Sequence, residues 1–284
     1  SEEAKYSYHL LREEPTVVGG VLVARPLNVD LALQPDGQNT GLFVAPLFAV
    51  GPTLAIAPGL RFDRHDAPDD EDLSPRLNVA WRAAPHTTLR AGWGEYAQSQ
   101  GVHELAVPFG DANFYRSEIA EHRVLSVEHR LAAGINVRLE AYQRSTDHPR
   151  PHWLNRYNTY NVFPEAQSDR VQLKPSQAEA RGVELLLRSR GQGRFDWTVS
   201  YAWARADETV GGVDIPAQRD QRHTVYADVS YAPSNVWRFS AAWQYHTGWP
   251  ITDVNYALVT LNSGSRATVR SFGPTLGSRL PAYH

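Results

Sequence analysis

The densest group of ionisable side chains in the sequence is the run DRHDAPDDED, residues 63–72, which carries six carboxylates. Carboxylate oxygens are ligands that Ca²⁺ prefers in proteins. The run lacks the spaced glycine and the terminal glutamate of an EF-hand loop. Two interpretations therefore remain, a solvated acidic loop, which is the commoner case, and a cation site.

A second candidate for metal chemistry is the pair His148 and His152, which are four residues apart. On a helix this spacing would bring the two imidazoles together, but Pro149 and Pro151 exclude a helix here. We therefore predict no metal site from these histidines. The sequence also shows no Ser, His and Asp arrangement typical of a catalytic triad and no glycine-rich phosphate loop.

The segment RPHWLNRYNTYNVF, residues 150–163, combines aromatic rings with arginine and asparagine side chains. Aromatic platforms and planar hydrogen-bond donors are suited to gripping a chelate or a sugar. The alternative is that these rings only pack the loop against its neighbours. A smaller set of the same kind follows residue 113. The candidate ligand-binding residues are Arg150, Trp153, Asn155, Arg156, Tyr157, Asn158, Tyr160, Phe114, Tyr115 and Arg116.

The composition limits the classes of protein to consider. The 284 residues are 42% hydrophobic and 11% aromatic, and the formal charge is −3. A chain of this length forms one large all-β unit or two ordinary domains. The near-neutral charge gives no basic footprint for nucleic acid, and the absence of cysteine excludes a disulfide framework and a cysteine metal site. We expect no cofactor.

The elements that must position the candidate residues are strands. The uncharged stretch GLFVAPLFAVGPTLAIAPGL, residues 41–60, is long enough for a transmembrane helix, but its prolines at 46, 52 and 58 exclude one. From Thr53 the apolar residues alternate with small or polar ones, which is the period of a strand. The stretch therefore predicts two strands joined by a tight turn, with Pro58 at an edge or a bulge.

The same alternation recurs along the chain and predicts antiparallel strands in meander order over residues 40–247. Short turns near residues 51, 85, 133, 192 and 234 alternate with long polar segments at about 65–73, 98–119, 147–177, 207–219 and from 248 onward. Outer-membrane barrels have this asymmetry of short turns and long loops. A soluble β-sandwich has the same alternation of faces but does not usually sort its loops by length.

Strand length and aromatic placement favour the membrane interpretation. Strands of about 11 residues, tilted by about 40°, cross roughly the hydrocarbon thickness of a bilayer. Several aromatic residues lie toward the strand ends on the apolar face, as interfacial girdles do. They are Trp81, Trp93, Trp197, Trp203, Tyr231, Trp237, Trp243 and Tyr245.

Several segments together carry a family resemblance. They are SPRLNVAWRAAPHTTLRAGWGEYAQ (74–98), AEHRVLSVEHRL (120–131), ARGVELLLRSR (180–190), FDWTVSYAWARA (195–206) and RDQRHTVYADVSYAPSNVWRFSAAWQYHTGWP (219–250). In combination they resemble the β-barrel of TonB-dependent outer-membrane receptors, over about residues 40–284. Residues 1–39 are consistent with it but uninformative.

The resemblance implies an all-β fold, a transmembrane antiparallel up-and-down barrel of about 22 strands that is plugged by an N-terminal domain. The chain corresponds to a C-terminal part of such a barrel, with about eleven strands, and we expect the plug domain and the last strands to be missing from it. The resemblance also implies a place in the cell outer membrane, in contact with its lipid, and uptake of a scarce ligand such as a metal chelate, a vitamin or a glycan. The implied partners are a small extracellular ligand and the TonB complex, which acts through the missing plug.

Two other classes of function remain open. A passive porin-like or structural outer-membrane barrel needs neither a plug nor TonB. An outer-membrane enzyme barrel needs an acidic residue or a serine beside a histidine near the rim, and Asp147 with His148 is the neighbouring pair to consider. We expect no enzyme activity.

Overall fold

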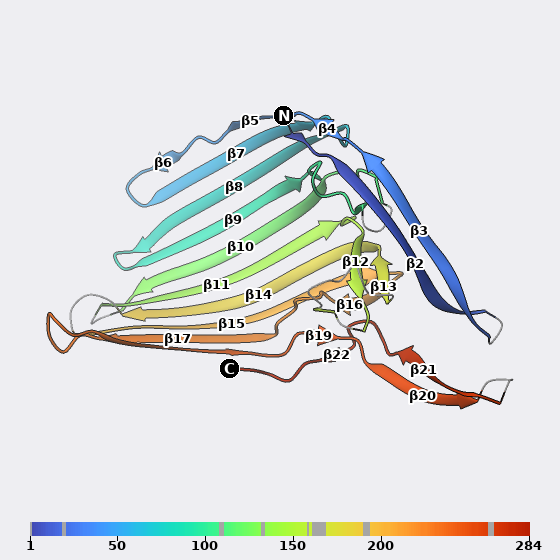
Figure 1. The fold of residues 1–284 in the computed structure, drawn as a ribbon. Helices are drawn as coiled ribbons and strands as arrows, with labels where there is room; N and C mark the ends of the chain where they lie inside the picture. The colour runs from blue at the N-terminus through green and yellow to red at the C-terminus, as the bar shows by residue number, and fades with distance from the viewer. Residues whose placement is uncertain are drawn as a thin grey trace.

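The computed structural model describes residues 2–18, 21–107, 111–131, 134–157, 159–160, 169–189, 194–260 and 264–284. Each named element of regular structure in these ranges is a β-strand (Figure 1). Among them, no helix is long and apolar enough to cross a membrane. The stretch 41–60, whose prolines exclude a helix, contributes to three strands instead.

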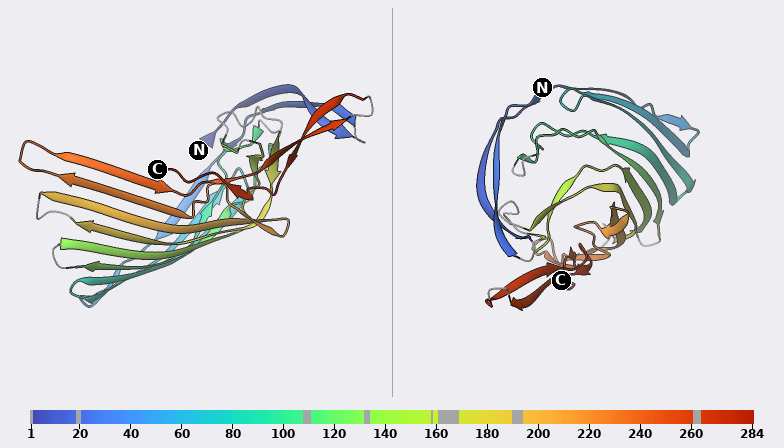
Figure 2. Two further views of the ribbon diagram at one scale, coloured as in Figure 1. Left: turned by 90° about the horizontal axis from the view of Figure 1, so that it is seen from below. Right: turned by 90° about the vertical axis from the view of Figure 1, so that its right-hand side faces the viewer.

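The main sheet is an antiparallel meander of twelve strands. In sheet order its long path is β5 (Asn39–Val44), β7 (Leu54–His65), β8 (Asp70–Ala84), β9 (Thr87–Gln98), β10 (Glu118–Arg130), β11 (Ile135–Asp147), β14 (Pro175–Ser189), β15 (Phe195–Val210), β17 (His223–Tyr231) and β18 (Phe239–His246). The short strands β6 (Phe48–Val50) and β16 (Val213–Pro216) pair with β7 and β15. The predicted meander is confirmed. The sheet curves around one side without closing into a barrel (Figure 2).

The remaining strands form two-stranded sheets outside the main sheet. They are β2 (Tyr6–Val18) with β3 (Val21–Leu33), β1 (Glu2–Glu3) with β4 (Asp36–Gly37), β12 (His152–Asn155) with β13 (Arg170–Leu173), β19 (Pro250–Ile251) with β22 (Ser278–Arg279), and β20 (Val254–Thr260) with β21 (Arg266–Phe272). All of them lie toward one end of the sheet, which we call the loop end (Figure 1). Residues 2–37 thus form hairpins rather than further strands of the main sheet.

The connections sort by length as predicted. At the opposite end, called the turn end, lie the turns 51–53, 85–86 and 232–238. The turns predicted near 133 and 192 include residues 132–133 and 190–193, which are outside the described part of the chain. One predicted loop is wrong. Instead of a long segment at 65–73, β7 and β8 continue to His65 and Asp70 and leave a turn of 66–69. Strand pairing survives the acidic composition because charged partners lie beside the carboxylates, such as Arg61, whose Nε donates to Asp63 Oδ2 at 2.6 Å.

The register gathers the alternating apolar residues into rows on one face. One row consists of Leu89, Val127, Leu139, Leu185 and Tyr201, and the next of Ala91, Leu125, Ala141, Val183 and Trp203. Leu125 is 62% exposed, so the described residues provide no covering layer over this face. The connections near the loop end lie on the inside of the curve (Figure 2). The apolar face is therefore the outside of the wall, as in a barrel whose outer surface contacts lipid.

Pro46 and Pro58 lie where the pairing of β7 with β5 and β6 is interrupted. Val44 pairs with Leu60 and Phe48 pairs with Ile56, so the register between them places Pro46 opposite Pro58. Neither residue has an N–H to donate. The two residues without a backbone donor face each other, so few backbone hydrogen bonds are lost in this gap. Pro58 thus lies in the second strand of the sheet, with Leu77 of β8 on one side and the gap between β5 and β6 on the other.

A single strand tests which face contacts lipid. In β15, Val199 belongs to the outer face, where its partners are Leu187 and Ala227, and Thr198 points the other way. In the assembled protein, a fluorescent probe at residue 199 should be quenched by lipids with brominated acyl chains, and a probe at 198 should not. Val199→Arg should destabilise the assembled barrel by about 2 to 4 kcal/mol, whereas Thr198→Arg should be tolerated. Equal quenching at the two positions would show that the outer face does not contact lipid.

Candidate functional site

The connections at the loop end form a layer against the inner face of the sheet. The β9–β10 connection is fixed to β8 by the Ser117 N–H, which donates to Asp70 Oδ2 at 2.7 Å. The Tyr6 hydroxyl of β2 donates to the Val102 carbonyl at 2.9 Å. Within this connection Val102, Leu105 and Val107 are buried. Few other apolar side chains in the described residues are as well buried, so the ordered interior of the chain lies in its loops.

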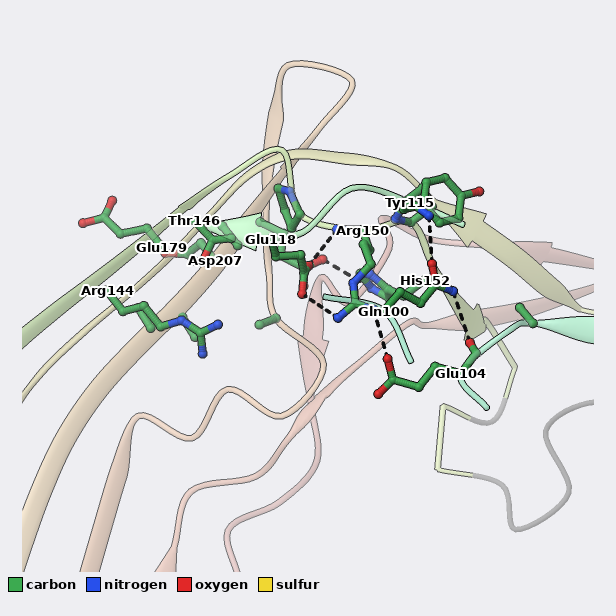
Figure 3. Close-up of a pocket in the computed structure, with 18 of the residues that line it drawn as sticks. Gln100, Glu104, Tyr115, Glu118, Arg144, Thr146, Arg150, His152, Glu179 and Asp207 are labelled. Carbon is green, nitrogen blue, oxygen red and sulfur yellow. Dashed lines mark hydrogen bonds and ion pairs between the residues drawn. The ribbon is translucent and has the colours of Figure 1, made fainter. Parts of the chain in front are cut away.

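Between this layer and the strands is a hollow of about 530 Å³ (Figure 3). The strands β11, β14 and β15 form its wall, and the β9–β10 and β11–β12 connections and the start of β12 cover it. Its polar lining includes Gln100, Glu104, Tyr115, Glu118, Arg144, Thr146, Arg150, His152 and Glu208. A volume of this size accommodates a small ligand.

Arg150 holds the covering loops together. Its backbone N–H donates to Glu118 Oε1 at 2.7 Å, and its guanidinium contacts Glu118 at 3.3 Å and Glu104 at 3.1 Å (Figure 3). The Arg150 side chain is only 16% exposed. Because charge-assisted hydrogen bonds of a partly buried arginine are among the stronger polar contacts, this residue ties the β9–β10 connection to the β11–β12 connection.

The carboxylate of Glu104 is stabilised in its ionised form. Burial by itself raises the pKa of Glu104, but hydrogen bonds from the Gly101 N–H and from Arg150 lower it by more, so the pKa lies below the ordinary value of 4.5. Next to it, Gln100 accepts the Tyr115 N–H at 2.9 Å and donates to the Glu104 carbonyl at 3.4 Å. The loop therefore closes on itself through polar contacts as well as through its buried valines and leucine.

A second polar contact crosses the hollow from hairpin to wall. His152 Nε2 of β12 lies 3.4 Å from Glu208 Oε2 of β15. Arg144 of β11 extends toward the open space, whereas Glu179 points away from it (Figure 3). The hollow thus presents both hydrogen-bond donors and acceptors, and a polar ligand has partners of either kind there.

A second hollow lies beside the first, across the segment Pro149–Pro151. Its volume is about 600 Å³, and its lining includes Tyr115, Arg116, Asp147 and His148. Asp147 and His148 share this hollow with Ser117 and Ser145, and His148 has a left-handed φ of 53°. In the described residues, no group of three or more His, Cys, Asp or Glu side chains is arranged to hold a metal ion.

The structure separates the predicted ligand residues into two groups. Tyr115 and Arg150 line the first hollow, and Tyr115, Arg116 and Arg150 line the second. Phe114 lies half-buried beside them in the same connection. Trp153 and Asn155 lie in β12, where Asn155 is 1% exposed and bonds to Arg170. These last two positions have structural partners.

The rest of the aromatic segment contacts the C-terminal part of the chain. The Arg156 guanidinium lies 4.4 Å from the centre of the Phe272 ring, and Arg270 lies 5.1 Å from the Tyr157 ring. The Tyr160 hydroxyl donates to the carbonyls of Gln218 and Pro250, and burial raises its pKa to about 12. Packing against neighbours, the alternative considered above, thus describes Tyr160. Asn158 and residues 161–163 lie outside the described part of the chain.

The acidic run 63–72 is a hairpin end rather than a loop. Asp63 and Asp72 are directly opposite each other on the inner face, and Arg61 binds Asp63. Asp72 is 5% exposed, with His65 Nε2 at 3.8 Å from its Oδ2. Arg61 thus pairs with Asp63, whereas the buried Asp72 Oδ2 has no hydrogen-bond partner among the described residues.

Several residues of the first hollow were missed by the sequence analysis. Arg144 and Glu208 could have been found from the sequence, because the alternation of polar and apolar residues along β11 and β15 assigns both to the inner face, beyond the apolar rows. Glu104 and Glu118 carry none, since their approach to Arg150 depends on how two connections fold over each other.

Comparison with protein families identifies this architecture. The family model described as the TonB-dependent receptor-like β-barrel matches residues 6–284. The chain belongs to the TonB-dependent receptor family. As part of such a receptor barrel, it lies in the outer membrane, with its loop end at the extracellular side. A comparison with curated protein sequences finds no match.

Solved receptor structures share the fold of this receptor barrel. The outer-membrane transporter YddB from Escherichia coli has a TM-score of 0.61 at 9% identity, over 95% of this chain and 42% of that one. The siderophore receptor PirA from Acinetobacter baumannii has a TM-score of 0.60 at 13% identity, over 83% and 38%. The FrpB iron transporter from Neisseria meningitidis has 0.55 at 14%, over 84% and 37%. The chain thus spans well under half the length of these structures.

Replacing Arg150 tests its role in the receptor's loop layer. Arg150→Gln leaves Glu104 and Glu118 without their shared cation, so hydrogen exchange of amides 100–107 should accelerate about tenfold, corresponding to roughly 1 to 2 kcal/mol. Arg64→Gln is the matched control, because the Arg64–Glu71 pair is solvent-exposed on both sides and should contribute little. Equal exchange in Arg150→Gln and the wild type would remove Arg150 from this role.

The pKa of Glu104 predicts an acid dependence of the same loop. Since its pKa is lower in the folded loop than in an unfolded chain, its contribution is complete above the unfolded value near 4.5 and is lost as the pH falls through the lowered folded value. Protection factors of amides 100–107, corrected for intrinsic exchange, should therefore decline in acid. In Glu104→Gln this part of the decline should disappear, and an unchanged pH profile would contradict the assignment.

Proposed function

We propose that the protein containing this chain is an outer-membrane receptor that takes up a scarce small ligand with energy supplied by TonB. The ligand class is a metal chelate, a vitamin or a glycan, and TonB acts through an N-terminal plug domain that belongs to the rest of the protein, together with the last barrel strands. The observation that carries the proposal is the ligand-sized hollow between the inner face of the wall and the loop layer.

The arrangement of the hollow supports uptake from outside the cell. It lies at the loop end, above the apolar rows, so a ligand reaches it before reaching the membrane level. Its loops are tied down by the Arg150 contacts, and an ordered surface binds a ligand with a smaller loss of conformational entropy. FrpB and PirA are described as an iron transporter and a siderophore receptor, which favours a metal chelate for this chain as well.

A passive barrel is the second candidate. It would require only the wall, and the wall is the better-defined part of the chain. The buried polar contacts of Gln100 and Arg150 count against it, because a simple pore has no need of loops that order a hollow on the inner face.

The decisive measurement is uptake by cells that express the complete protein. The probes are a ⁵⁵Fe-loaded catecholate siderophore, ⁵⁷Co-labelled cobalamin and a labelled oligosaccharide, each with and without a protonophore. Uptake of one probe that stops when the protonophore is added supports the receptor. If all three probes enter in a size-limited way that the protonophore does not affect, the protein is a passive porin and the receptor proposal is wrong. If no probe enters, the result favours a structural barrel.

Substitutions in the loops distinguish the two groups of predicted residues. The double variant Tyr115→Ala, Arg144→Gln alters the hollow's lining and should weaken binding of the transported probe at least tenfold without preventing assembly. The triple variant Trp153→Ala, Tyr157→Ala, Tyr160→Ala tests the aromatic segment in the same assay. Arg64→Gln, outside both hollows, is the control. Unchanged affinity in the double variant would remove the first hollow from the binding site.

A further inference from the structure

The outer face of the wall changes character at one ladder row. Above the apolar row Ala91, Leu125, Ala141, Val183 and Trp203 comes a row of Trp93, Arg123, Gln143, Arg181 and Arg205. The next row consists of Glu95, Glu121, Ser145, Glu179 and Asp207. On β10, β14 and β15 the outward side chains therefore run from apolar to arginine to acidic within four residues.

Arg181 and Arg205 are direct cross-strand partners on β14 and β15. Side chains in this relation lie about 5 Å apart, and like charges placed so are destabilising. Arg205 forms an ion pair with Asp207. Arg181 forms no ion pair within the described part of the chain, and Glu179, the nearest acid along its strand, accepts instead from Gln143 Nε2 at 3.0 Å. One positive charge of this pair is thus left for an external anion.

The position of the pair selects the kind of anion. The arginines directly follow the apolar rows that contact lipid, at the level where the headgroups of the surrounding leaflet begin. Trp203 lies in the row immediately below, as an interfacial aromatic residue does. The acidic row above repels anions that come from the solvent side. An anion attached to an acyl chain reaches the arginines from below without crossing that row.

We propose that Arg181 and Arg205 form a site for the phosphate of a lipid headgroup in the outer leaflet. The site lies on the outer face, separate from the loop hollow, and it does not depend on which ligand the receptor transports. The guanidinium of Arg181 binds the phosphate directly, and Arg205, held by Asp207, adds the second positive charge. Arg123, two strands away and paired with Glu121 at 2.7 Å, extends the basic row.

The test is lipid binding by the complete protein, purified in a neutral detergent and followed by native mass spectrometry. The probe is lipid A with two phosphates, and phosphatidylcholine is the zwitterionic reference. We expect the wild type to retain lipid A preferentially. Arg181→Gln combined with Arg205→Gln should weaken that binding by about fivefold for each arginine removed. The single variant Arg181→Lys should bind lipid A more tightly than the double variant, because the positive charge at residue 181 is kept.

The matched control is Arg90→Gln, which removes an arginine from the inner face of the same wall, where Arg90 lies 3.1 Å from Glu128. Its lipid A binding should equal that of the wild type. Equal binding in the Arg181, Arg205 double variant would overturn the proposal, as would an equal loss in Arg90→Gln. Displacement of lipid A by millimolar inorganic phosphate would also overturn it, since the site would then recognise a free anion. Thermal unfolding without lipid should be similar in both variants, so a folding defect is distinguished from lost binding.

Discussion

The requirement that every backbone donor and acceptor be paired inside lipid governs this structure. A strand in hydrocarbon has no water to bond, so each one needs a neighbour on both sides. The antiparallel meander meets this requirement for the strands between its two edges with partners close in sequence, and the register that results places whole rows of side chains on one face. The facing prolines 46 and 58 show the same constraint, because they occupy the one gap in the β5–β7 and β6–β7 ladder where no donor is required.

A wall built in this way has almost no core of its own. Its apolar side chains face outward, and its stability as a wall comes from the ladder and the surrounding lipid. The buried apolar cluster of Leu154, Leu173 and Leu276 lies instead in the loop-end hairpins and the C-terminal segment. The buried apolar side chains of the described residues therefore lie mainly at the loop end rather than in the wall.

Polar contacts align this loop layer with the wall. The side chain of Asp220 is fully buried and accepts from the Ala206 N–H at 2.7 Å and from Arg222 Nε at 2.8 Å. It also binds Arg279 of β22. One carboxylate thus links β15, the residue before β17 and the strand β22. Arg150 has the corresponding role on the other side of the hollow, and the two clusters together determine the shape of the space between loops and sheet.

The sequence by itself determined the wall. Alternation with period two depends only on which side chains suit lipid and which suit the inner face, so the strands, their meander order and the outward position of residues such as Val199 could all be predicted. Turn positions followed as well, because glycine and proline act locally. The acidic run 63–72 was predicted wrongly as a loop, since the Arg61–Asp63 ion pair and the cross-strand pairing, which a polarity pattern does not show, allow the strands to continue.

Only the tertiary structure decided the candidate site. Glu104, Glu118 and Arg150 lie 14 to 46 residues apart, in two connections and at the start of β10, and no periodic pattern relates them. The sequence indicated the right kind of residue in the aromatic segment, but packing divided it, with Arg150 at the hollow and Tyr160 bonded to the carbonyls of Gln218 and Pro250. A strand's faces are set by its own residues, whereas the geometry of a loop is set by the contacts it makes with distant parts of the chain.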